Sequence, residues 1–176
     1  TNGFKLAVGK IEVPVIWAKT SVVGNNIPAK LWQGCGDPYV YWEYPVKGVQ
    51  PVGYSYAWGD MPDNQADTKG DFYQTPSDLL GDGVRVFNLK AENSAGNWGE
   101  TASFEIWIDR GSPVIGNYSP SKSAILASDK PTITISATDD KSGVDPNAIN
   151  MKINKATVDA AYDQNAQSII YVPSIP

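Results

Sequence analysis

Histidine is absent from this 176-residue chain, and cysteine occurs once, at Cys35. Without an imidazole, neither a Ser-His-Asp arrangement nor a Cys-His pair can form, and a metal site would have no histidine ligand. A single cysteine also excludes an intramolecular disulfide. We expect Cys35 to be a passive side chain, because a nucleophilic thiol needs an adjacent activating group.

Long apolar runs and basic patches are also missing. No stretch approaches the roughly 20 apolar residues that a helix needs to cross a bilayer. The chain has 14 basic and 19 acidic residues and a net charge of −5, with no cluster of lysine and arginine. These properties argue against nucleic acid as a partner and against membrane insertion.

The residues that are frequent belong to turns and strands. The chain contains 16 glycines, 13 prolines, nine tyrosines and six tryptophans, and 41% of its residues are hydrophobic. Side chains alternate with a period of two along most of the sequence, and long helical periodicity is nearly absent. The composition and the period together predict an all-β fold of short strands joined by tight turns.

Period-two runs predict the strands of a first domain. The polar segment Asn93–Asn97 tolerates left-handed backbone angles and is predicted to be a hairpin loop between two of them. The predicted strands are 11–17, 39–45, 53–58, 72–80, 84–92 and 101–109. The side chains expected to share a face within a strand are Tyr54, Tyr56 and Trp58, then Phe87, Leu89 and Ala91, and then Ala102, Phe104, Ile106 and Ile108.

The segment Asp109–Pro113 is short, polar and closed by a proline, and it predicts a domain boundary. A second series of period-two runs follows it. The predicted strands are 114–118, 131–138, 148–158 and 168–173. Strands at this spacing, separated by turns, are typical of β-sandwiches.

Several motifs resemble immunoglobulin-like and fibronectin type III-like modules of bacterial secreted and surface proteins. They are Tyr39–Pro45, Gly53–Trp58, Leu80–Gly83, Asn88–Asn97 and Phe104–Pro113, with Thr138–Asp145 in the second series. The resemblance implies an all-β chain of tandem immunoglobulin-like (fibronectin III-like) β-sandwiches, at 27–113 and 114–176. It also implies an extracellular or cell-surface location.

The second module departs from this pattern because residues 114–176 number only 63, against about 100 for a complete sandwich. It is therefore short or incomplete. Three explanations stay open: the parent protein continues, the domain is a shorter complete one, or another chain donates the missing strand. The N-terminal β extension, residues 1–26, belongs to no module and is the candidate donor. Its donor side chains are Leu6, Val8, Ile11, Val13, Val15 and Trp17.

Acidic loops are candidates for calcium, which takes six to eight oxygen ligands. The first loop supplies Asp60, Asp63, Asp67 and Asp71, without the spacing of an EF-hand. The second candidate set is Asp139, Asp140 and Asp145, and the resemblance adds Asp109 near the boundary. The alternatives are a solvated loop for the first set and a turn built by side chain–backbone bonds for the second.

The tryptophans divide into core and surface candidates. Trp42 and Trp58 are expected in the core, whereas Trp17 and Trp32 cannot be placed. Alternation turns Trp107 outward beside Glu105, and Trp98 lies at the tip of the hairpin loop. Exposed indoles at Trp98 and Trp107 would stack on sugars or contact a partner. The alternative is packing against the N-terminal segment or the next module.

No catalytic arrangement is evident, and we expect the chain not to be an enzyme and to need no cofactor other than calcium. The leading hypothesis is a non-catalytic structural or adhesive module of an extracellular or cell-surface protein, including a surface-fibre subunit assembled by β-strand donation. Its partners would be other copies of itself or neighbouring domains of a longer chain. The alternative is a carbohydrate-binding accessory module that recognises polysaccharide through exposed tryptophans.

Overall fold

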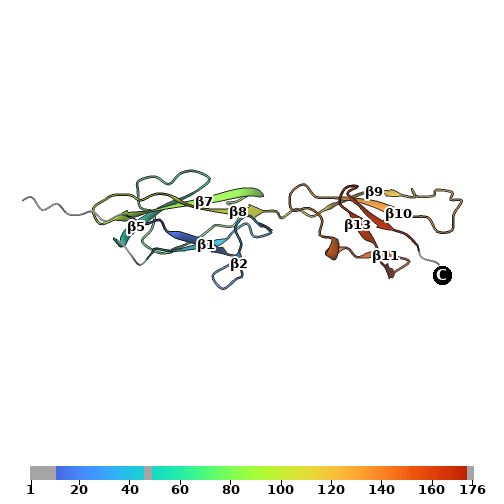
Figure 1. The fold of residues 1–176 in the computed structure, drawn as a ribbon, viewed down its shortest axis with the longest axis horizontal. Helices are drawn as coiled ribbons and strands as arrows, with labels where there is room; N and C mark the ends of the chain where they lie inside the picture. Colours follow the sequence, from blue (N-terminus) through green and yellow to red (C-terminus); the bar gives the residue numbers. More distant parts are fainter. Residues whose placement is uncertain (1–10, 46–48, 174–176) are drawn as a thin grey trace, which may run out of the picture. The chain divides into compact units, whose positions relative to one another are not determined.

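The computed structural model describes residues 11–45 and 49–173, and these form two compact units, Thr1–Arg110 and Gly111–Pro176 (Figure 1). The division falls inside the segment predicted as a boundary. Within the described ranges the regular structure is β-strand, apart from one short 3-10 helix. The all-β expectation is therefore confirmed.

Unit 1 contains two four-stranded sheets, an arrangement consistent with a β-sandwich. Among the described residues of this unit, the strand pairs are antiparallel except the pair of β3 with β8. The first sheet has the order β2 (Asn26–Ile27), β1 (Val15–Lys19), β4 (Tyr39–Glu43) and β6 (Phe72–Gln74). The second has the order β3 (Trp32–Gln33), β8 (Ala102–Ile108), β7 (Gly83–Asn93) and β5 (Pro51–Trp58).

The core of unit 1 lies between these sheets and is centred on aromatic rings. Trp42 and Phe87 are 1% and 0% exposed, and their ring centroids are 6.2 Å apart. The inward faces predicted for β5, β7 and β8 are confirmed, because each supplies side chains that are buried in the core or packed against it. The buried core residues include Ile16, Ala18, Val40, Trp42, Tyr54, Phe87, Leu89, Ala91, Ala102, Ile106 and Ile108, with Tyr56, Trp58 and Phe104 packed on them.

The hairpin loop between β7 and β8 also has the predicted conformation. Asn93 is buried, and its Oδ1 accepts hydrogen bonds from the N–H groups of Ala95, at 2.9 Å, and Asn97, at 3.0 Å. Gly96 has φ +78°, a left-handed angle that glycine adopts without a side-chain clash. One asparagine side chain therefore shapes the whole turn.

The prediction that residues 1–26 lie outside the first module is wrong for β1. This strand is interior in its sheet, paired with β2 on one side and β4 on the other. Its buried residues are Ile16 and Ala18, whereas Val15 is 49% exposed and Trp17 faces outward. Alternation counted from Ile11 fails because the buried Pro14 interrupts it.

Strand β6 is shorter than predicted. It covers three residues instead of the expected 72–80, and a turn follows it. Pro76 has no N–H to continue a ladder, so the strand ends before it. Leu80 then returns to the core from the loop, where it is 4% exposed.

Unit 2 has one four-stranded sheet and a separate hairpin. The sheet order is β13 (Ala161–Asp163), β14 (Ser168–Tyr171), β10 (Ile133–Thr138) and β9 (Val114–Ser119). The single strand predicted at 148–158 is instead the 3-10 helix η1 (Pro146–Ala148) and the hairpin of β11 (Met151–Ile153) and β12 (Ala156–Val158). The hairpin turns at Asn154 and Lys155, whose φ angles are 50° and 70°.

Candidate functional site

The acidic loop 60–71 is attached to strands of both sheets of unit 1. Asp63 Oδ1 accepts a hydrogen bond from Ser55 Oγ at 3.3 Å, and Asp67 Oδ2 accepts one from the Tyr56 N–H at 2.9 Å. The backbone carbonyl of Asp60 accepts from Asn88 Nδ2 at 2.8 Å, and that of Asp71 accepts from the Trp42 N–H at 2.9 Å. These four aspartates therefore hold the loop against neighbouring strands.

The aspartates of unit 2 build local turns. Asp139 Oδ1 accepts hydrogen bonds from the N–H groups of Lys141, at 3.0 Å, and Gly143, at 2.9 Å, while Asp145 caps η1. Asp140 forms an ion pair with Lys141. Across residues 11–45 and 49–173, no three His, Cys, Asp or Glu side chains form a group that could hold a metal ion. The structure does not bring the predicted calcium ligands, Asp109 included, into such a group.

The two tryptophans predicted as ligand contacts, Trp98 and Trp107, belong to unit 1, and each contacts other side chains of that unit. Trp107 points outward from β8, its indole N–H donates to Glu105, and its ring is tilted against Trp32 with the centroids 5.3 Å apart. Trp98 is half-buried, and the Lys90 Nζ lies 5.3 Å from its ring centroid. Each indole thus combines packing with partial exposure.

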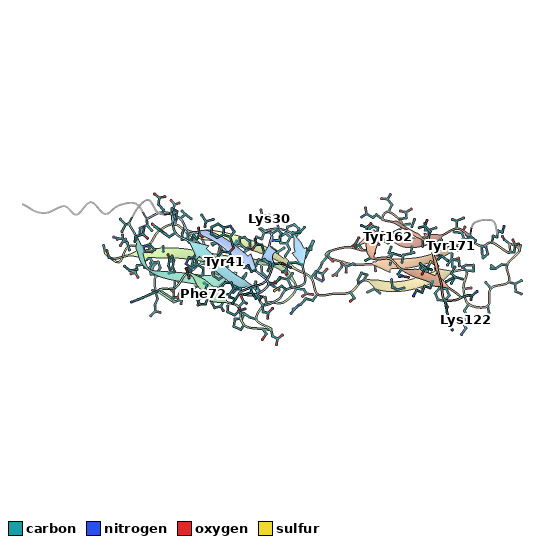
Figure 2. The ribbon with its side chains drawn as sticks, turned by 90° about the horizontal axis from the view of Figure 1, so that it is seen from below. Lys30, Tyr41, Phe72, Lys122, Tyr162 and Tyr171 are labelled. Atoms are coloured by element: carbon teal, nitrogen blue, oxygen red, sulfur yellow. The ribbon has the colours of Figure 1, made fainter. Side chains whose placement is uncertain are left out.

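A larger aromatic surface lies on the outer face of the first sheet of unit 1. We call Trp17, Tyr39, Tyr41 and Phe72 the aromatic face, and Figure 2 shows Tyr41 and Phe72 on this unit. Trp17 stacks on Tyr41 with the centroids 5.6 Å apart and the planes 19° from parallel. Tyr39 stacks on Tyr41 at 6.3 Å and 27°, and on Phe72 at 5.4 Å and 23°. The four rings form one continuous, nearly parallel array.

The sequence pattern did not predict the aromatic face, although it contains the alternation that turns two of the four rings outward. Tyr39 and Tyr41 alternate with Val40 and Trp42, so an inward Trp42 turns both tyrosines outward. Trp17 could be added only by pairing β1 with β4, which sets it directly opposite Tyr41. The array is therefore a consequence of strand pairing.

The rim of the aromatic face is polar and nearly neutral. Lys19 Nζ lies 5.0 Å from the Tyr41 ring centroid, and Glu43 lies at the exposed end of β4. The hydroxyl groups of Tyr39 and Tyr41 make no hydrogen bond to any other residue in the described part of the chain. These hydroxyls can therefore bond a ligand without breaking an internal contact.

The second candidate surface is an open apolar groove in unit 2. It has a volume of about 620 Å³ and lies beside the edge strand β9, on which Ile115 is 60% exposed. In the described part of this unit, Ala137 and Ile169 are the only buried hydrophobic residues, 0% and 9% exposed. The apolar lining of the groove includes Ile115, Ile135, Ala137, Val144, Ile149, Met151 and Ile169.

Cys35 is half-buried, with Sγ 3.6 Å from Asp37 Oδ1 and 3.7 Å from the Thr20 carbonyl oxygen. Burial raises the pKa of the thiol, and the Asp37 charge raises it further. Because only the thiolate is nucleophilic, alkylation by iodoacetamide at pH 8 should be slower in the folded chain than in the urea-unfolded chain. The rate–pH curve of the folded chain should also lie at higher pH. Equal rates in the two states would contradict this assignment.

A scan against family models and a search of curated proteins gave no match to this chain. Within the ranges that the structure describes, no helix has the length and apolarity needed to cross a bilayer. Function is therefore inferred from the two surfaces, the aromatic face of unit 1 and the apolar groove of unit 2.

Proposed function

We propose that the chain is a non-catalytic structural and adhesive part of an extracellular or cell-surface protein. Its two units would be tandem modules similar to immunoglobulin-like and fibronectin type III-like domains, the second completed by a β-strand from another polypeptide. The observation that carries this proposal is the open groove beside the edge strand of unit 2. A groove beside a free strand edge can accept a β-strand from another polypeptide and so join two chains.

The edge and the groove together match what an added strand needs. Strand β9 is at the end of its sheet, so one row of its backbone N–H and C=O groups faces outward. A strand that pairs with this edge gains main-chain hydrogen bonds and places alternate side chains in the adjacent groove. Ile115 and Tyr118 on β9 are 60% and 55% exposed, so the added strand would also cover apolar surface.

The contrast between the two units supports this interpretation. Unit 1 buries a continuous cluster of apolar residues between two sheets. Unit 2 has a single four-stranded sheet faced by a two-stranded hairpin, with the groove lined from both. Small domains bury a low fraction of their surface and are marginally stable, so an additional apolar strand would stabilise unit 2 strongly.

We assign the donor strand to the N-terminal residues of a second copy. Most of the predicted donor segment is not available for donation, because β1 belongs to unit 1 and Ile11 and Val13 pack on the unit 1 core. The Glu12 N–H also donates to the Tyr44 hydroxyl at 2.6 Å. The remaining donor side chains, Leu6 and Val8, lie outside the described residues. Head-to-tail contacts that do not close would produce filaments.

The test is self-association of the full chain, measured by light scattering after size exclusion and by negative-stain electron microscopy. We expect concentration-dependent oligomers that are lost on deleting residues 1–10 and in Ile115→Lys, which places a charge in the groove. Val114→Lys is the matched control, because Val114 is the adjacent and equally exposed position outside the groove lining. It should assemble normally.

Two outcomes would contradict strand donation by a second copy. A monomer at all concentrations would show that the N-terminus does not enter the groove of another chain. Oligomers that survive both the deletion and Ile115→Lys would place the contact elsewhere on the molecule.

A further inference from the structure

We propose that the aromatic face of unit 1 binds an extended, uncharged polysaccharide by stacking sugar rings on Trp17, Tyr41, Tyr39 and Phe72. This inference goes beyond the structural role proposed above. It uses a different unit and a different surface, and it does not depend on strand donation.

The first argument is that the array is preformed. Each ring is carried by a paired strand, on β1, β4 or β6, and each is held by at least one neighbouring ring at 5.4–6.3 Å. A rigid platform loses little conformational freedom when a ligand binds, so most of the contact energy is available for affinity. Aromatic side chains also need few rotatable bonds to present a large surface.

The second argument is chemical complementarity. An aromatic ring has a negative face, which attracts the polarised C–H groups on the apolar side of a pyranose ring. The hydroxyl groups around the sugar then need polar partners, and the hydroxyls of Tyr39 and Tyr41 and the ends of Lys19 and Glu43 lie on the same side of the sheet. The combination of an apolar centre and a polar rim suits a carbohydrate.

The third argument is charge. Nucleic-acid bases also stack on aromatic rings, but they come with phosphates that need a lysine- and arginine-rich groove. On the outward positions of β1, β4 and β6, the ionisable groups besides the tyrosines are Lys19 and Glu43, one of each sign. The chain as a whole carries −5. This surface therefore favours a neutral ligand over a polyanion.

The fourth argument is shape. The rings lie on the outer face of a sheet, so they present an open surface to the ligand. Trp17 and Phe72 stand opposite Tyr41 on the two flanking strands, and Tyr39 lies two residues before Tyr41 on β4, so the rings form a platform three strands wide. A platform of this width suits more than one sugar unit of a polysaccharide better than a single terminal sugar.

The experiment is retention of the full chain on insoluble cellulose and chitin, with affinity electrophoresis in soluble xylan and mixed-linkage β-glucan. We expect binding to at least one of these neutral polysaccharides. Tyr41→Ala removes the ring that links Trp17 to Tyr39 and should weaken affinity by about tenfold, the order of loss that alanine substitution causes for a base stacked on an aromatic side chain. Phe72→Ala, at the end of the array, should weaken it less.

Matched controls separate this proposal from the alternatives. Phe72 is 50% exposed, so Phe72→Ala should fold normally, and an unchanged thermal transition would show that its effect is on binding. Trp107→Ala removes an aromatic ring from the other sheet and should leave retention unchanged. Ile115→Lys should also bind polysaccharide normally, so that failure of strand donation and failure of this proposal are distinguishable.

The proposal would be overturned by the absence of retention on all four polysaccharides. It would also be overturned by retention that persists in Tyr41→Ala and is lost in Trp107→Ala, which would move the site to the other sheet. Self-association that disappears in Tyr41→Ala, without any polysaccharide binding, would show that the face contacts a second copy instead.

Discussion

Replacing Phe87 with alanine should lower the free energy of unfolding of unit 1 by about 3–5 kcal/mol. Phe87 is 0% exposed, and its ring contacts the rings of Trp42, Tyr56, Trp58 and Tyr73, with centroid distances of 6.2, 5.6, 5.1 and 6.0 Å. Truncation removes the central ring of this cluster and leaves a cavity. Side chains held on two sheets collapse into such a cavity only in part, so the lost contacts are not recovered.

Urea titration followed by tryptophan fluorescence measures this effect selectively. All six tryptophans lie at or before residue 107, in unit 1, so the indole signal does not report on unit 2. Phe72→Ala is the matched control, because the same truncation at a half-exposed position should cost less than about 1 kcal/mol. Equal losses in the two variants would show that Phe87 is not the centre of the core.

Replacing Asn93 with alanine should destabilise unit 1 by about 2–3 kcal/mol. Asn93 is 2% exposed, and its Oδ1 is the acceptor for two backbone N–H groups of the β7–β8 turn. Alanine removes both hydrogen bonds and leaves two donors to be satisfied in a tight loop. The same titration checks the result.

Two neighbouring variants isolate the role of the Asn93 acceptor. Asn93→Asp keeps an oxygen at the same place and should retain most of the stability at neutral pH. Ser94→Ala changes an exposed residue of the same turn and should be within about 0.5 kcal/mol of the parent chain. If Asn93→Asp were as unstable as Asn93→Ala, the two N–H contacts would not be the source of the effect.

Local features of unit 1 could be predicted from the sequence because their cause is local. The inward faces of β5, β7 and β8 follow from alternation, since successive side chains of a strand point to opposite sides. The turn at Asn93–Asn97 follows from residues that tolerate left-handed angles or bond their own backbone. The outward direction of Trp107 follows from the same alternation, with Ile106 and Ile108 buried on either side.

Long-range contacts decide what spacing alone does not show. The aspartates of the 60–71 loop have the composition of a calcium site. In the structure the carboxylates of Asp63 and Asp67 accept hydrogen bonds from Ser55 and Tyr56, and the backbone carbonyls of Asp60 and Asp71 accept hydrogen bonds from Asn88 and Trp42. The residues up to 26 looked like an extension because no short-range signal pairs β1 with β4, whose paired residues are 20 to 28 positions away. A single proline, Pro14, was enough to reverse the apparent inward face.

The sequence by itself determined that this chain is all-β, which side chains of the long strands enter the core, and how the β7–β8 hairpin turns. These depend on alternation and turn chemistry, which act over a few residues. Only the tertiary structure decided that β1 lies beside β4, and this pairing joins Trp17, Tyr39, Tyr41 and Phe72 in one array. It also decided that unit 2 leaves a groove beside β9. Both surfaces arise from contacts between segments that are distant in the sequence. Local patterns do not specify these contacts, because their free energies depend on which segments pack together.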